Sequence, residues 1–198
     1  MASLVIAAAF LALALAACKR VQPLDTAPLD HTGMSYDAIQ ELKKMNITAA
    51  EIAEMAQARE AGLPDADCVE VLSIYRGRGQ VFNAGSALAG LIRVGLRDDT
   101  ILELARMNQL DRSWGELQAM RLAGMSDAIV LEVARHRAQD RPVLSGASLA
   151  RLKNAGLREA TLLELARRGV PDAQADAILS ARRHRASAAD ILRHFTGS

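Results

Sequence analysis

Few side chains in this 198-residue sequence have the types and spacing from which catalytic or metal sites are built. A cysteine nucleophile needs a histidine partner, and Cys68, in the stretch DADCVEVL, has no histidine near it in the sequence. No HExxH, GxSxG, P-loop or strand-linked GxGxxG motif occurs. Three of the four histidines stand in arginine-rich stretches typical of helix C-termini, where a cation is favourable: His136, His184 and His194. We therefore expect no catalytic residue, no metal site and no cofactor.

The other cysteine, Cys18, ends an uncharged apolar run that starts at Leu4. The sequence Leu15-Ala16-Ala17-Cys18 resembles the lipobox of bacterial lipoproteins. The resemblance implies that residues 1–17 are a signal peptide and that Cys18 carries acyl chains, so that membrane lipid is one partner of the protein. The run is shorter than the ~20 apolar residues of a membrane-spanning helix. An ordinary signal peptide and a buried N-terminal helix are the alternatives.

Residues after Cys18 bear on where the lipid anchor would lie. In the lipoprotein family, an aspartate directly after the cysteine retains the protein in the inner membrane, and this chain has Lys19 there. The resemblance thus implies a lipid-anchored protein of the bacterial cell envelope, at the outer membrane and facing the periplasm. Residues 18–35 hold two prolines and no apolar periodicity, which predicts a flexible tether.

From Tyr36 onward, apolar residues recur at helical spacing and no alternating strand pattern appears. A similar sequence segment occurs three times, over residues 88–107, 117–137 and 149–169. Each copy contains a glycine suited to the left-handed end of a helix, followed by an apolar residue. Asparagine tolerates the same conformation. We therefore expect tight turns between helices, called corners below, at Asn46, Gly62, Gly95, Gly124, Gly156 and Gly169.

The corners make a specific prediction about packing. In a Schellman ending, the residue after the left-handed position contacts the residue four before that position. The predicted pairs are Ile47 and Leu42, Leu63 and Ala58, Leu96 and Leu91, Met125 and Met120, Leu157 and Leu152, and Val170 and Leu165. Thr48 and Glu51 have the spacing of a capping box at the start of the next helix.

These signals predict an all-α domain over residues 36–198. We expect about ten or eleven short helices, arranged as quasi-repeated helix hairpins in a curved stack or an orthogonal bundle. Glycine-rich and proline-containing stretches predict possible seams near 76–86 and 138–146.

Charge and composition favour a protein partner over nucleic acid. The net charge is +1, so the protein has no strong overall electrostatic field that would attract nucleic acid. Aromatic residues make up 3% of the chain, so few rings are available on which bases could stack. The charge is uneven: residues 35–140 hold 12 basic and 16 acidic side chains, whereas residues 141–198 hold 10 and 5. The candidate partner-binding residues are Trp114, because indole rings anchor interfaces, and the basic cluster of Arg182, Arg183 and Arg185.

The repeated phrase is also similar to the helix-hairpin-helix motif of DNA-binding proteins. That motif has two glycines one residue apart in its turn, whereas each corner here has one, and acidic residues follow. We favour a membrane-anchored envelope lipoprotein that acts as a non-enzymatic helical scaffold or protein-interaction module, with envelope proteins and no nucleic acid as partners. An envelope enzyme or accessory hydrolase with an unrecognised site is the first alternative, and a nucleic-acid-binding module is the second.

Overall fold

The computed structural model describes residues 24–196, and all regular secondary structure in that range is helical. The predicted all-α class is therefore confirmed, while the proposed signal peptide and Cys18 lie outside the described residues. Twelve α-helices and one 3-10 turn follow one another: α2 Ala27–His31, α3 Tyr36–Lys44, α4 Ala49–Glu60, α5 Asp65–Gly77, α6 Gly85–Arg93, α7 Asp98–Arg106, α8 Leu110–Leu122, α9 Asp127–Ala138, α10 Gly146–Asn154, α11 Glu159–Arg167, η1 Asp172–Gln174, α12 Ala175–Arg183 and α13 Ala188–Thr196.

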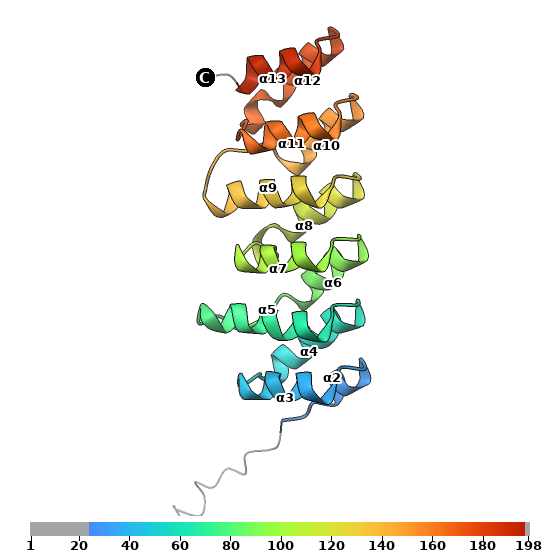
Figure 1. Ribbon diagram of the computed structural model, residues 1–198, viewed down its shortest axis with the longest axis vertical. Helices are drawn as coiled ribbons and strands as arrows, with labels where there is room; N and C mark the ends of the chain where they lie inside the picture. The colour runs from blue at the N-terminus through green and yellow to red at the C-terminus, as the bar shows by residue number, and fades with distance from the viewer. Residues whose placement is uncertain (1–23, 197–198) are drawn as a thin grey trace, which may run out of the picture.

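The helices form six hairpins, numbered here 1 to 6, from α2/α3 to α12/α13. The first helix of each hairpin packs on the first helix of the next hairpin, and the second helices pack on one another in the same way. The result is a column of two helical layers with hairpin 1 at one end and hairpin 6 at the other (Figure 1). Each hairpin buries its apolar surface mainly against its neighbours, which is the architecture of a repeat protein.

Every helix from α2 to α12 is followed by a residue with positive φ. All six predicted corners are among these residues, and in all six predicted pairs the later residue donates its N–H to the carbonyl of the earlier one, for example Leu157 to Leu152 at 3.1 Å. The predicted capping box is also present, with Thr48 and Glu51 bonded reciprocally. Five further corners were not predicted: Gly33, Gly79, Asn108, Asp140 and Arg185. Residues 36–196 nevertheless contain eleven α-helices, within the expected number, and the twelfth, α2, lies before residue 36.

The stack begins before the predicted boundary at residue 36. Helix α2 lies within the segment assigned to the flexible tether, and it packs on α4 through the fully buried Leu29. Pro28 fits the first turn of this helix. One buried leucine in a short polar segment creates no apolar periodicity, so the sequence pattern missed it.

The two predicted seams are loops between hairpins and do not divide the core. Helix α4 packs on α6 across the first loop, and α8 packs on α10 across the second. The first loop contributes Phe82, whose ring meets Tyr75 edge-to-face with centroids 5.2 Å apart. The second contributes Val143 and Leu144 to the same continuous core.

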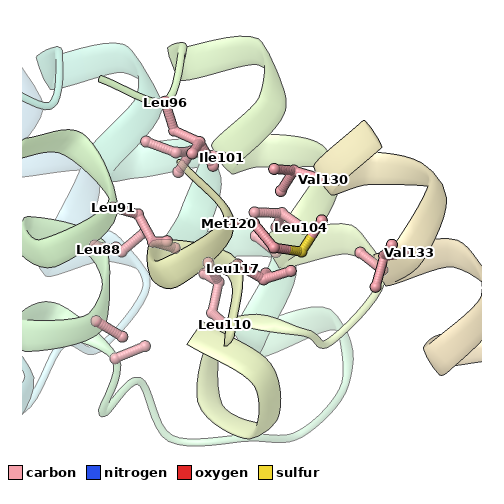
Figure 2. Packing of buried hydrophobic residues seen from close by; sticks show 14 of the residues in the cluster. Leu88, Leu91, Leu96, Ile101, Leu104, Leu110, Leu117, Met120, Val130 and Val133 are labelled. Carbon is pink, nitrogen blue, oxygen red and sulfur yellow. The ribbon is translucent and has the colours of Figure 1, made fainter. Parts of the chain in front are cut away.

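Aliphatic side chains fill the space between the two layers. Figure 2 shows Leu91 and Leu104 approaching Met120 from different helices. Because few rings intervene, some helices approach very closely. A Cβ atom on Gly85, the first residue of α6, would lie 2.0 Å from the backbone oxygen of Glu54 in α4.

Candidate interaction surface

Two kinds of chemistry can be checked in the described residues: a metal site and a cysteine nucleophile. No group of three or more His, Cys, Asp or Glu side chains within residues 24–196 could hold a metal ion. Cys68 is fully buried, and burial raises the pKa of its thiol to about 12, so the thiolate needed for nucleophilic attack is not formed near neutral pH. No described helix combines the length and hydropathy needed to cross a membrane.

The most deeply buried carboxylate, that of Glu51, has a structural role. It accepts hydrogen bonds from the N–H groups of Thr48 and Phe82, both at 2.9 Å, and from Arg76 at 2.6 Å. Burial alone would raise the pKa of Glu51, but these hydrogen bonds lower it to about 2. Arg76 also donates to the carbonyl oxygens of Met45 and Asn46. The ion pair therefore fixes the connections between hairpins 1, 2 and 3.

A carboxylate contact joins neighbouring hairpins and recurs along one edge of the column. This is the edge where the two helices of each hairpin are connected. The carboxylate belongs to the first residue of the second helix in one hairpin. It accepts a hydrogen bond from the backbone N–H of the residue just before the second helix in the preceding hairpin. Three such contacts occur: Ser35 N–H to Asp65 at 2.9 Å, Arg97 N–H to Asp127 at 3.1 Å, and Ser126 N–H to Glu159 at 2.8 Å. Each hydrogen bond favours the ionised carboxylate, and the pKa values of all three acids are lowered.

This contact is incomplete at two junctions. Between hairpins 2 and 3 the donor is missing, because Pro64 has no N–H; the acid, Asp98, is exposed to solvent. Between hairpins 5 and 6 the acceptor is missing, because Ala188 stands where the acid is expected. The donor at this junction is the backbone N–H of Arg158, the residue that precedes α11.

Trp114 lies on α8 with 37% of its surface exposed. One edge of its indole ring packs on α6, with Cζ3 3.4 Å from the position a Cβ atom would take at Gly90. Leu122, eight residues later on the same helix, is 74% exposed. Eight residues make just over two turns of helix, so both side chains lie on the solvent-exposed part of α8. Leu122 continues the apolar pattern of its helix, so the sequence alone does not distinguish it from a buried residue.

The three predicted arginines lie at the end of α12 and at its corner. Arg182 is partly buried and donates to the carbonyl oxygens of Ala155 and Gly156, both at 3.3 Å. Arg183 and Arg185 are exposed, and Arg185 adopts φ 62° at the corner. Helix α10 lies between α8 and α12 (Figure 1). Trp114 and the arginines therefore belong to two separate surfaces.

The chain matches no family model, no curated protein and no solved structure. Its function is therefore inferred from its own residues. Two surfaces carry that inference: the exposed face of α8 and the basic end formed by hairpins 5 and 6.

Proposed function

We propose that the protein is a bacterial envelope lipoprotein, anchored through acyl chains on Cys18, whose helical column is a non-enzymatic scaffold for other envelope proteins. The Leu15–Cys18 motif supports the anchor, and Lys19 favours the outer membrane, facing the periplasm. The buried carboxylates of the described residues support the scaffold role, because Glu51 and Asp127 bond to neighbouring hairpins and do not converge on a cavity.

The observation that carries the interaction role is the pairing of Trp114 and Leu122 on α8. Four large hydrophobic side chains are exposed within residues 24–196, and only these two share a helix. Tryptophan is enriched among the residues that dominate binding energy at protein interfaces, and here its ring is already held on one side by α6. We therefore assign the outer face of α8 as a contact surface for an envelope protein.

The anchor is tested by metabolic labelling with a fatty-acid probe. We expect the wild-type protein to incorporate the probe and to fractionate with membranes. The Cys18→Ser variant should do neither, and Cys68→Ser should behave as wild type. A wild-type chain that stays unlabelled and cytoplasmic would refute the proposed location.

The contact surface is tested by placing a photo-crosslinking amino acid at Leu122 and, as a matched control, at the exposed Ser73 of α5. We expect a discrete crosslinked species from position 122 in membranes and none from position 73. Trp114→Ala should remove the species without lowering the amount of folded protein. Equal crosslinking from both positions would show that the α8 face has no special role.

A further inference from the structure

Two junctions of the column are built from the same residues, 61 positions apart in the sequence. Hairpins 3 and 4 meet through Arg97, Thr100 and Arg121, and the equivalent positions at the junction of hairpins 5 and 6 are Arg158, Thr161 and Arg182. The one difference in the carboxylate contact is that Asp127 of the first junction is replaced by Ala188 in the second. The first junction therefore provides a structural comparison for the second.

In the first junction, donors from both hairpins surround the Asp127 carboxylate. Its Oδ2 accepts the Arg97 N–H at 3.1 Å, the Arg97 Nε–H at 3.3 Å and the Thr100 hydroxyl at 2.9 Å. Its Oδ1 lies 3.3 Å from Arg121 Nη1. Two guanidinium groups, a hydroxyl and a backbone N–H thus converge on one carboxylate that is 7% exposed.

In the second junction the donors remain in place without the acid. Arg182 is held as Arg121 is: it donates to the carbonyl oxygen of Gly156, just as Arg121 donates to that of Gly95. Thr161 is 5% exposed, so it is buried like Thr100 of the first junction, which is 1% exposed. Neither Arg158 nor Arg182 has a carboxylate within ion-pair distance in the described part of the chain.

A hollow of about 200 Å³ occupies this place. It is lined by Gly156, Leu157, Arg158, Arg182, Ala188 and Ile191. Arg158 is exposed and Arg182 is half-buried, so a carboxylate entering from solvent can reach both, and charge-assisted hydrogen bonds are stronger than neutral ones. The surrounding region is also basic, with 10 basic and 5 acidic side chains over residues 141–198.

We propose that this hollow, the carboxylate pocket, binds a carboxylate group of a partner polypeptide, which takes the position that Asp127 occupies in the equivalent junction. One oxygen accepts from the Arg158 N–H and the Thr161 hydroxyl, and the other faces the Arg182 guanidinium. The exposed Arg158 side chain closes over the ligand as Arg97 closes over Asp127. Use of the pocket by an envelope protein rests on the proposed function, whereas carboxylate binding itself depends only on residues 156–191.

The test is an NMR titration of the full chain with sodium acetate against sodium chloride at equal ionic strength, following the backbone amide of Arg158. We expect a saturable shift with acetate and none with chloride. Ala188→Asp should fill the pocket from within: the Arg158 amide should already be shifted without acetate, the response to acetate should be lost, and Tm should rise. Ala189→Asp adds the same charge to the same helical turn and should keep the response.

Arg158→Gln provides a second variant that leaves the partly buried Arg182 in place. It should weaken acetate binding about tenfold, as expected for the loss of one charge-assisted hydrogen bond. An Arg158 amide that does not respond to acetate, responds equally to chloride, or responds alike in Ala188→Asp and Ala189→Asp would overturn the proposal. Because acetate is the probe, these outcomes are independent of whether Cys18 is acylated or α8 binds a partner.

Discussion

The carboxylate of Asp127 accepts a hydrogen bond from the backbone N–H of Arg97, 3.1 Å away and thirty residues earlier in the chain. This contact fixes the register between hairpins 3 and 4 at the edge of the column. Thr100 and Arg121 bind the same carboxylate. Asp127 is thus a structural residue that satisfies donors from two hairpins at once.

Replacing Asp127 with asparagine should therefore destabilise the protein. The amide keeps the shape of the side chain but loses the charge that two arginines and a backbone N–H face. We expect the free energy of unfolding to fall by about 1–3 kcal/mol, measured by urea denaturation at pH 7. Asp37→Asn, at an exposed carboxylate of α3, is the control and should change it by less than about 0.5 kcal/mol. Equal effects would mean that the contact contributes nothing specific.

Glu51 should make stability depend on pH in a defined direction. Its pKa is about 2 in the folded protein against an ordinary value of 4.5. A lowered pKa means that the contribution is fully present above about pH 4.5 and is lost as the pH falls toward 2. The contribution at neutral pH is of order 3 kcal/mol. Stability of wild type and Glu51→Gln, measured from pH 7 to pH 2.5, should converge at the acidic end.

The exposed Glu60 is the matched control for this series. Glu60→Gln should follow the wild-type curve throughout. A gap between wild type and Glu51→Gln that stays constant with pH would show that packing, and not ionisation, causes the difference.

Substitution by alanine should change the stability of the protein in opposite directions at two glycines. A Cβ atom at Gly85 would lie 2.0 Å from the Glu54 backbone oxygen, so Gly85→Ala must force α6 away from α4 and should cost about 1–3 kcal/mol or more. At Gly115, within α8, a Cβ atom would meet nothing within 4 Å. Gly115→Ala should stabilise the protein by about 0.5–1 kcal/mol through helix propensity. Thermal unfolding of both variants checks the signs, and the same sign for both would contradict this account of the close approach.

Cys68 should be unreactive in the folded protein. The side chain is fully buried and burial raises the pKa of its thiol to about 12. In a Cys18→Ser background, a thiol reagent should modify Cys68 only as fast as the α4–α5 region opens, and immediately in denaturant. Rapid modification under native conditions would mean that this part of the core is accessible.

Local signals in the sequence predicted much of the fold, because each corner needs only residues close to it. The corners found in advance pair a left-handed residue with an apolar one after it, as at Gly95 and Leu96. Three of the missed corners lack this second signal: Gly79 and Asn108 are followed by glutamine, and Asp140 by arginine. Arg185 was missed because arginine rarely adopts a left-handed conformation. Gly33 was missed because it lies in the segment interpreted as a tether.

The contacts between hairpins were not predictable in the same way. That Asp127 reaches the N–H of Arg97 depends on how one hairpin lies on the next, which no local pattern encodes. Trp114 and Arg182 were singled out by residue type and charge alone. The structure shows that Arg182 also holds a neighbouring corner, and that Ala188 is the informative residue beside it. An alanine at an exposed position carries no signal until the equivalent junction is compared with it.

Because each hairpin packs on its neighbours, a structural change at one end of the column has a limited effect at the other end. Hairpin 6 packs on hairpin 5, and any influence on hairpin 1 must pass through five successive junctions, each of which can loosen without the rest. The junction at Ala188 lacks a contact that three others have, so the last hairpin is the one whose detachment disturbs the remainder least. A ligand bound at that junction should therefore perturb hairpins 5 and 6 first, and hairpin 1 least.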